Sequence, residues 1–382
     1  MTKLFDDLFR THDLPAGYNE SGFDYLNRSA KSPIRKIRDL LEDWFSRYPS
    51  TDQFELRQRF RSRDEYNHSS AFFELWLHEL LVRLGCTAKV HPPIPGTNRR
   101  PDFLVKSLQK YDFYLEAIHV TGASGDDSRA QARLNVLYDS LNYLNSPNFF
   151  INLDVNGTPN TPVPARDIRF FLERELAQLK PELIDRFLHL RRFDLIPQWR
   201  FEHEGLRIKC WPTPKPIELR GVAGVRTVAA TTFGGIIESE TPIKNAVIGK
   251  AKRYGLLDLP LVVAVNATDS FISDRDVLSA LYGSVSGRHE PEMLNDSRGV
   301  WGSIDNPAWT RLSAVLVTYK LRSEKLVGPA CLHHNPRAVR LYSGELTRLT
   351  QIKPANNRLI THDGESLESI MGLSADFPED ES

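Results

Sequence analysis

The chain has 382 residues, and its apolar content of 41% and charged content of 26% are typical of a globular protein. Its 49 basic and 49 acidic residues give a formal net charge of zero, which argues against a protein that coats nucleic acid nonspecifically but still allows a locally basic groove. The three cysteines are odd in number and widely separated, so we do not expect a disulfide framework. The N-terminus lacks the apolar segment of a signal peptide. No apolar run approaches the ~20 residues of a membrane span. We therefore expect a cytoplasmic protein without a membrane partner.

The first element that the sequence predicts is a helix from Ser32 to about Tyr48. Apolar residues recur there at helical spacing, and Pro49 ends the pattern. Residues 1–31 show no comparable regularity. We interpret residues 1–50 as an N-terminal helical arm that packs against the rest of the chain.

The strongest helical pattern covers Ser70 to Leu84, and Gly85 follows it at a position typical of a helix C-cap. Glu74 lies about 100° around this helix from Phe73, at the edge of the apolar face. From an edge position its carboxylate can reach a site where the helix meets a sheet. The alternative interpretation is an ordinary solvated glutamate.

Two short apolar runs follow a predicted strand at Thr87 to His91, and each of the two carries one carboxylate. Asp102 opens the first run after a proline, and Glu116 lies inside the second. A turn centred near Gln109 would make the runs an antiparallel hairpin in which Asp102 falls opposite Glu116, with Cβ atoms roughly 5 Å apart. A register slip of one residue would instead place them on opposite faces. Two buried carboxylates at that distance need a cation between them, so the pattern predicts a hard-cation site.

The order of an amphipathic helix, a strand, a Pro-Asp strand and a Glu strand resembles the core of the PD-(D/E)XK nuclease superfamily, the restriction-endonuclease-like fold. The resemblance covers about residues 65–121 and implies an α/β protein with an αβββαβ core and a central mixed sheet. It also implies that Asp102 and Glu116 hold Mg²⁺ or Mn²⁺, and that Glu74 matches the acidic residue that many members carry on the helix before the sheet.

Arg99 and Arg100 lie in the loop just before the predicted hairpin, next to the expected metal. Arginine side chains in this position are candidate contacts to a DNA phosphate. A solvated polar turn is the alternative interpretation of the same residues.

The sequence departs from the superfamily at Ile118, where the family carries a lysine that helps to activate the attacking water. Side chains of a strand repeat every second residue, so Ile118 shares the face of Glu116 and the position is a true vacancy. Lys106 lies on the face of Asp102 but about 13 Å along the strand, which is too far. His119 is adjacent in sequence but faces away from Glu116.

Lys250 is the best candidate for the missing amine. It lies on a helix predicted from Asn245 to Tyr254, where Lys250 and Tyr254 resemble a helix motif of one nuclease subfamily. A lysine has a long stem and a compact charge, so it can reach the vacancy from a helix. The alternative is a solvated lysine beside Lys252 and Arg253.

Two later segments could supply the last helix and strand of the core. The first is a helix from about Ser128 to Leu144 followed by a strand from Phe149 to Val155. The second is the helix of Lys250 followed by the apolar run from Leu259 to Asn266, which is typical of a strand buried on both faces. The sequence does not decide between them.

These observations divide the chain into five expected regions. They are the arm at 1–50, a nuclease-like core at 51–156, a helical and hairpin insertion at 157–240, a second α/β part that completes or extends the core at 241–360, and a tail at 361–382. The tail is acidic and polar, so we expect it to be disordered toward its end.

The resemblance implies Mg²⁺-dependent hydrolysis of phosphodiester bonds in DNA, in defence or DNA processing, with Asp102, Glu116, Lys250 and Glu74 in the active site. It leaves a homodimer open as the assembly. The alternative is a catalytically inactive protein of the same fold that binds nucleic acid or another protein. Ile118 is the reason to keep this alternative, because a broken motif is what such a protein would show.

Overall fold

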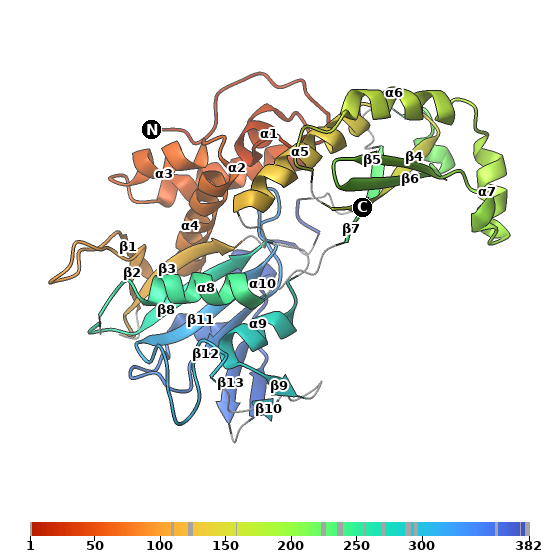
Figure 1. Ribbon diagram of the computed structural model, residues 1–382. Coiled ribbons are helices and arrows are strands. Elements are labelled where there is room, and N and C mark those ends of the chain that lie inside the picture. The colour runs from red at the N-terminus through yellow and green to blue at the C-terminus, as the bar shows by residue number, and fades with distance from the viewer. Residues whose placement is uncertain are drawn as a thin grey trace. The chain divides into compact units, whose positions relative to one another are not determined.

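The chain folds into two compact units in the computed structural model (Figure 1). The first unit comprises Met1–Arg10, Ser21–Gly122 and Ile237–Ser382, and the second comprises Thr11–Glu20 and Ala123–Ile236. The structure describes residues 2–107, 111–120, 125–157, 159–222, 227–234, 240–255, 257–268, 272–286, 292–293, 297–355, 358–374 and 376–378. The division differs from the expected regions, because residues 123–156 belong to the second unit and not to the core.

The helices of the first unit include both of the strongest helical patterns in the sequence. They are α1 (Gly22–Arg28), α2 (Ser32–Arg47), α3 (Gln53–Phe60), α4 (Glu65–Arg83), α8 (Glu240–Ala251), α9 (Asp274–Tyr282) and α10 (Leu367–Met371), with a 3-10 turn at Glu345–Arg348. Helix α4 begins earlier than the sequence pattern predicted, because Asp64 caps it by accepting the N–H of Asn67. It is buried on most of its surface because α1, α2, α3, α10 and the sheet all pack against it.

Ten strands of the described residues form one mixed sheet in the first unit. Their order is β1 (Thr87–Val90), β2 (Phe103–Lys106), β3 (Phe113–Val120), β8 (Leu261–Ala267), β11 (Leu312–Tyr319), β12 (Ala330–His334), β13 (Gln351–Ala355), β14 (Arg358–His362), β10 (Glu292–Met293) and β9 (Val285–Ser286). Strands β1, β2 and β3 are antiparallel, whereas β3, β8 and β11 are parallel. The protein is therefore of the α/β class, with a large mixed central sheet.

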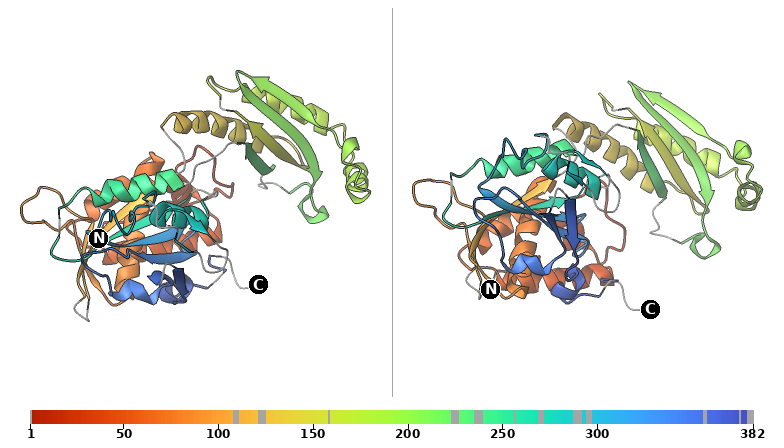
Figure 2. Two further views of the ribbon diagram at one scale, coloured as in Figure 1. Left: turned by 60° about the horizontal axis from the view of Figure 1, so that its bottom comes forward. Right: turned by 90° about the horizontal axis from the view of Figure 1, so that it is seen from below.

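Strand β8 is buried on both faces, as its continuous apolar run predicted. Val262 and Ala264 belong to the core on the α4 side, and Val263 and Val265 belong to the core on the side of α8 and α9. The helices thus cover both faces of the sheet (Figure 2). Because β8 pairs directly with β3, the α8–β8 unit, and not the earlier helix and strand, extends the carboxylate hairpin.

The second unit contains the other candidate helix and strand. Its four-stranded sheet has the order β5 (Trp199–His203), β6 (Leu206–Pro214), β4 (Phe149–Asn156) and β7 (Val228–Gly234). Its helices are α5 (Gly125–Asn142), α6 (Ala165–Leu176) and α7 (Pro181–His189), with 3-10 turns at Phe193–Leu195 and Ile217–Leu219. Apolar residues of α5, α6, β4 and β6 share one core. Strand β4 therefore forms its backbone hydrogen bonds within this unit, with β6 on one side and β7 on the other.

The C-terminal segment contains two elements that its acidic and polar composition did not predict. Strand β14 extends to His362, and α10 follows with Leu367, Ile370 and Met371 buried against the core of α4. These apolar residues recur at helical spacing within an acidic context, so overall composition concealed a docking helix. Residues 379–382 lie outside the described residues. No helix among the described residues has both the length and the apolar character to cross a membrane.

Candidate active site

The hairpin of β2 and β3 has the register that the sequence predicted. Phe103 pairs with Leu115 and Val105 with Phe113, which places Asp102 opposite Glu116. Asp102 lies just before β2, and its Oδ2 accepts the backbone N–H of Ala117 at 2.6 Å. The residues at the turn itself, 108–110, lie outside the described part of the chain. The two carboxylates therefore converge at the start of one strand and the middle of the next.

Helix α8 brings Lys250 between these carboxylates. The Nζ atom of Lys250 lies 2.5 Å from Oε2 of Glu116 and 3.2 Å from Oδ2 of Asp102. The helix packs on β3 and β8, and Lys250 lies in its last turn with only 7% of its surface exposed. Lys250 is thus not a solvated helix lysine. Its ammonium occupies the position between two like charges where a cation was expected.

Glu116 is fully buried and has two further contacts from the turn that follows α8. The hydroxyl of Tyr254 donates to its Oε1, and Nη1 of Arg253 lies 3.7 Å from its Oε2. Burial raises the pKa of the Glu116 carboxyl and the charge of Asp102 raises it further, whereas Lys250 and Tyr254 lower it. Burial and the contact with Glu116 raise the pKa of Tyr254 well above its usual value, so its hydroxyl stays protonated. Tyr254 was expected only as a motif position and was not among the predicted site residues.

Glu74 is also buried, so it is not a solvated glutamate. Its Oε1 accepts the hydroxyl of Tyr48 at 2.5 Å, and its Oε2 pairs with Nη2 of Arg59 at 2.7 Å. Burial raises the pKa of Glu74, and the Arg59 guanidinium and the Tyr48 hydroxyl oppose that shift. Tyr48 and Arg59 were not among the residues predicted for the site. They come from α3 and the end of α2, and nothing in the local pattern marks them as partners of Glu74.

A pocket of about 230 Å³ joins the two groups. Its lining includes Glu74 and Arg59 on one side and Asp102, Lys250 and Arg253 on the other. The pocket therefore combines carboxylates with three cationic side chains. Such a site can hold a polar, anionic ligand beside a cation.

Ile118, at the strand position where the superfamily carries a lysine, lines this pocket, and so does His119. His119 is buried, with Nε2 3.4 Å from Oγ1 of Thr268, and burial lowers its pKa to about 4. Arg99 and Arg100 are exposed in the loop before β2 and do not contribute to the lining of this pocket. Among the predicted site residues, the structure brings together Asp102, Glu116, Lys250 and Glu74 and leaves the two loop arginines outside.

The described residues contain no group of three or more His, Cys, Asp or Glu side chains arranged to hold a metal ion. Comparisons of the chain with protein-family models, with curated proteins and with solved structures gave no match. The function must therefore be inferred from the chemistry of this site.

Proposed function

We propose that the chain is a divalent-metal-dependent nuclease with a restriction-endonuclease-like core, which hydrolyses phosphodiester bonds in DNA. One observation carries the proposal: the amine of Lys250 lies between Asp102 and Glu116, beside the strand position where Ile118 replaces the family's lysine. Phosphodiester hydrolysis needs metal ligands, a group that deprotonates or orients water, and positive charge for the developing negative charge. The residues of this pocket, together with the buried Glu116 that pairs with Lys250, supply all three types of group.

The carboxylates fit Mg²⁺ or Mn²⁺ by chemical type. Mg²⁺ prefers oxygen ligands and often takes only one or two protein carboxylates, with water and substrate phosphate completing its shell. Asp102 and Glu116 provide two such carboxylates, so a third protein ligand is not required. A bound divalent ion would polarise the phosphate and lower the pKa of the attacking water.

The remaining side chains have roles set by their positions. Lys250 screens the repulsion between Asp102 and Glu116, and with a metal bound its ammonium can donate to a phosphate oxygen. Arg59 and Arg253 line the same pocket and can pair with phosphate oxygens. Glu74 is held by Tyr48 and Arg59, and can orient a water in the pocket.

A second candidate function is a nucleic-acid-binding or protein-binding module that has kept the fold without catalysis. One observation favours it: the ammonium of Lys250 already pairs with both carboxylates at the place where a metal ion would lie. Mg²⁺ binding separates the two candidates, because a nuclease needs the ion and a module built on the Lys250 bridge does not.

The test is cleavage of plasmid and linear DNA by the full chain with Mg²⁺ or Mn²⁺, together with Mg²⁺ titration by calorimetry. We expect Asp102→Asn and Glu116→Gln to abolish cleavage and Mg²⁺ binding, with the fold retained. Lys250→Met should lower the cleavage rate far more than Mg²⁺ affinity. Lys252→Met is the matched control, because Lys252 is the exposed lysine two residues along the chain. Full activity of Glu116→Gln would refute the site, and a wild-type chain that neither binds Mg²⁺ nor cleaves would favour the second candidate.

A compensating double variant tests whether Lys250 replaces the lysine that is missing at position 118. Because Ile118 faces the pocket beside Lys250, Lys250→Met combined with Ile118→Lys returns an amine to the strand position of the superfamily. We expect partial recovery of cleavage relative to Lys250→Met alone. No recovery, in a double variant that still binds Mg²⁺, would show that the two positions do not serve the same step.

A further inference from the structure

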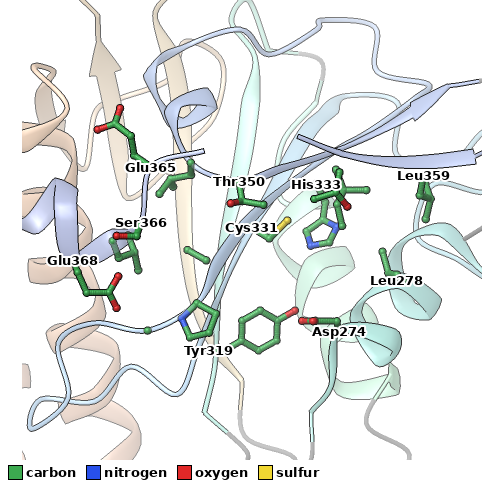
Figure 3. Close-up of a pocket in the computed structure, with 17 residues that line it drawn as sticks. Asp274, Leu278, Tyr319, Cys331, His333, Thr350, Leu359, Glu365, Ser366 and Glu368 are labelled. Carbon is green, nitrogen blue, oxygen red and sulfur yellow. The ribbon is translucent and has the colours of Figure 1, made fainter. Parts of the chain in front are cut away.

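A second pocket lies in the first unit, away from the carboxylate hairpin. It has a volume of about 610 Å³ and is lined by residues of α9, β12, β13, β14 and the start of α10 (Figure 3). That volume is within the ~300–1,000 Å³ range of small-molecule sites. It shares no lining residue with the first pocket.

The sheet register determines which side chains face this pocket. Val315 pairs with His333 and Val317 with Cys331, so His333 and Cys331 point to the face that α9 covers. Leu278 of α9 and Leu359 of β14 add apolar walls on the same side. The lining therefore combines apolar side chains with polar and charged ones.

His333 is the unexplained polar group of this pocket. It is 2% exposed, and neither of its ring nitrogens has a hydrogen-bond partner within the described part of the chain. Burial lowers the pKa of His333 to about 3, so the ring is neutral and carries one donor and one acceptor. Buried polar groups are normally paired, because an unpaired one carries its desolvation penalty. A ligand polar group at the inner wall of the pocket would supply the missing partner after a small movement of the ring.

The charged lining residues in the described chain are all acidic: Asp274, Glu365 and Glu368. Glu365 is paired with Arg348 at 2.6 Å, which leaves the carboxylates of Asp274 and Glu368 on either side of the pocket (Figure 3). The hydroxyl of Tyr319 points to Asp274, and burial with that carboxylate raises the pKa of Tyr319 far above its usual value. The pocket therefore attracts a cation and repels an anion.

We propose that this pocket binds a small organic amine with an apolar body, whose protonated amino group lies near Asp274 and whose body packs against Leu278 and Leu359. A polar N–H on that body would pair with the ring of His333. The proposal concerns a second site and does not depend on the nuclease function.

The test uses three probes that share an indole ring and differ in charge: tryptamine, indole and indole-3-acetate. We expect calorimetry on the full chain at neutral pH to show tryptamine binding most tightly, indole more weakly, and indole-3-acetate not at all. Asp274→Asn should weaken tryptamine binding about fivefold, as expected for one partly solvated charge pair, and leave indole unchanged. The exposed Asp305, which does not line the pocket, gives the matched control Asp305→Asn.

His333→Phe fills the same space without polar atoms, so we expect it to weaken both tryptamine and indole while the chain gains thermal stability without ligand. Indole-3-acetate binding as tightly as tryptamine would overturn the proposal. So would tryptamine binding that Asp274→Asn leaves unchanged, or no tryptamine binding at millimolar concentration. Asp274 is exposed, so its variant keeps the proposal testable even if His333→Phe does not fold.

Discussion

Replacing Lys250 with methionine should leave Glu116 as a buried carboxylate without its nearest cation, since Arg253 lies farther away at 3.7 Å. Lys250 lies 2.5 Å from Glu116 and 3.2 Å from Asp102, and Glu116 is fully buried. At an effective dielectric constant of ~20, one such pair about 3 Å apart has a Coulomb energy of roughly 5 kcal/mol before desolvation is subtracted. Removal of one partner of a buried pair typically costs about 3–5 kcal/mol. We therefore expect Lys250→Met to lower the local stability of the sheet by about 3–5 kcal/mol near pH 8.

The sign of the pH dependence follows from Glu116. Its pKa is already raised by burial, and loss of Lys250 removes a group that lowers it. A carboxyl whose pKa is raised in the folded state favours folding while it is protonated, and this contribution is lost as the pH rises through the folded pKa. The loss of local stability in Lys250→Met should therefore be smaller at pH 5 than at pH 8. The double variant Lys250→Met/Glu116→Gln should recover most of the stability at both values.

Hydrogen exchange by mass spectrometry is the suitable assay, because a chain with two units need not unfold in a single transition. Peptides that cover β3 and β8 report the opening free energy of the sheet beside Lys250, and Lys252→Met serves as the exposed-lysine control. Unchanged protection of these strands in Lys250→Met at pH 8 would refute the reasoning. It would mean that Lys250 does not bridge the carboxylates in solution.

Three other variants test neighbouring features. Tyr254→Phe removes a hydrogen bond that lowers the pKa of Glu116, so the acidic limb of the pH profile of kcat/KM should move to higher pH; no movement would contradict a role for ionised Glu116. Gly249→Ala should raise the melting temperature, with a gain of about 1 kcal/mol, because a Cβ there meets nothing within 4 Å on α8; a lower melting temperature would argue against that packing. Burial lowers the pKa of His78 from 6.5 to about 4, so wild-type stability should fall relative to His78→Phe by about 3 kcal/mol as the pH drops through that window. Hydrogen exchange of peptides that cover α4, at pH 7 and pH 4, measures this difference, and equal shifts of both chains would exclude His78 as the cause.

Local sequence patterns were enough to predict several elements, because periodicity and end signals act over a few residues. The helix from Ser32, the main part of α4 and the doubly buried strand β8 follow from their apolar spacing. The hairpin register that sets Asp102 against Glu116 also follows, since the loop is short and one register puts both apolar runs into the core.

Long-range packing decided the rest. Lys250 and Glu116 are 134 residues apart, and no local pattern states whether α8 or α5 covers β3. The same holds for Tyr48 and Arg59 around Glu74, and for α10, whose acidic neighbours suggested disorder. The sequence by itself determined the strongest helices and strands and offered the hairpin register in which two carboxylates meet. Lys250 was a candidate from the sequence, but only the tertiary structure decided that its amine is buried between them, because the free energy of burying a charge depends on every group that packs around it.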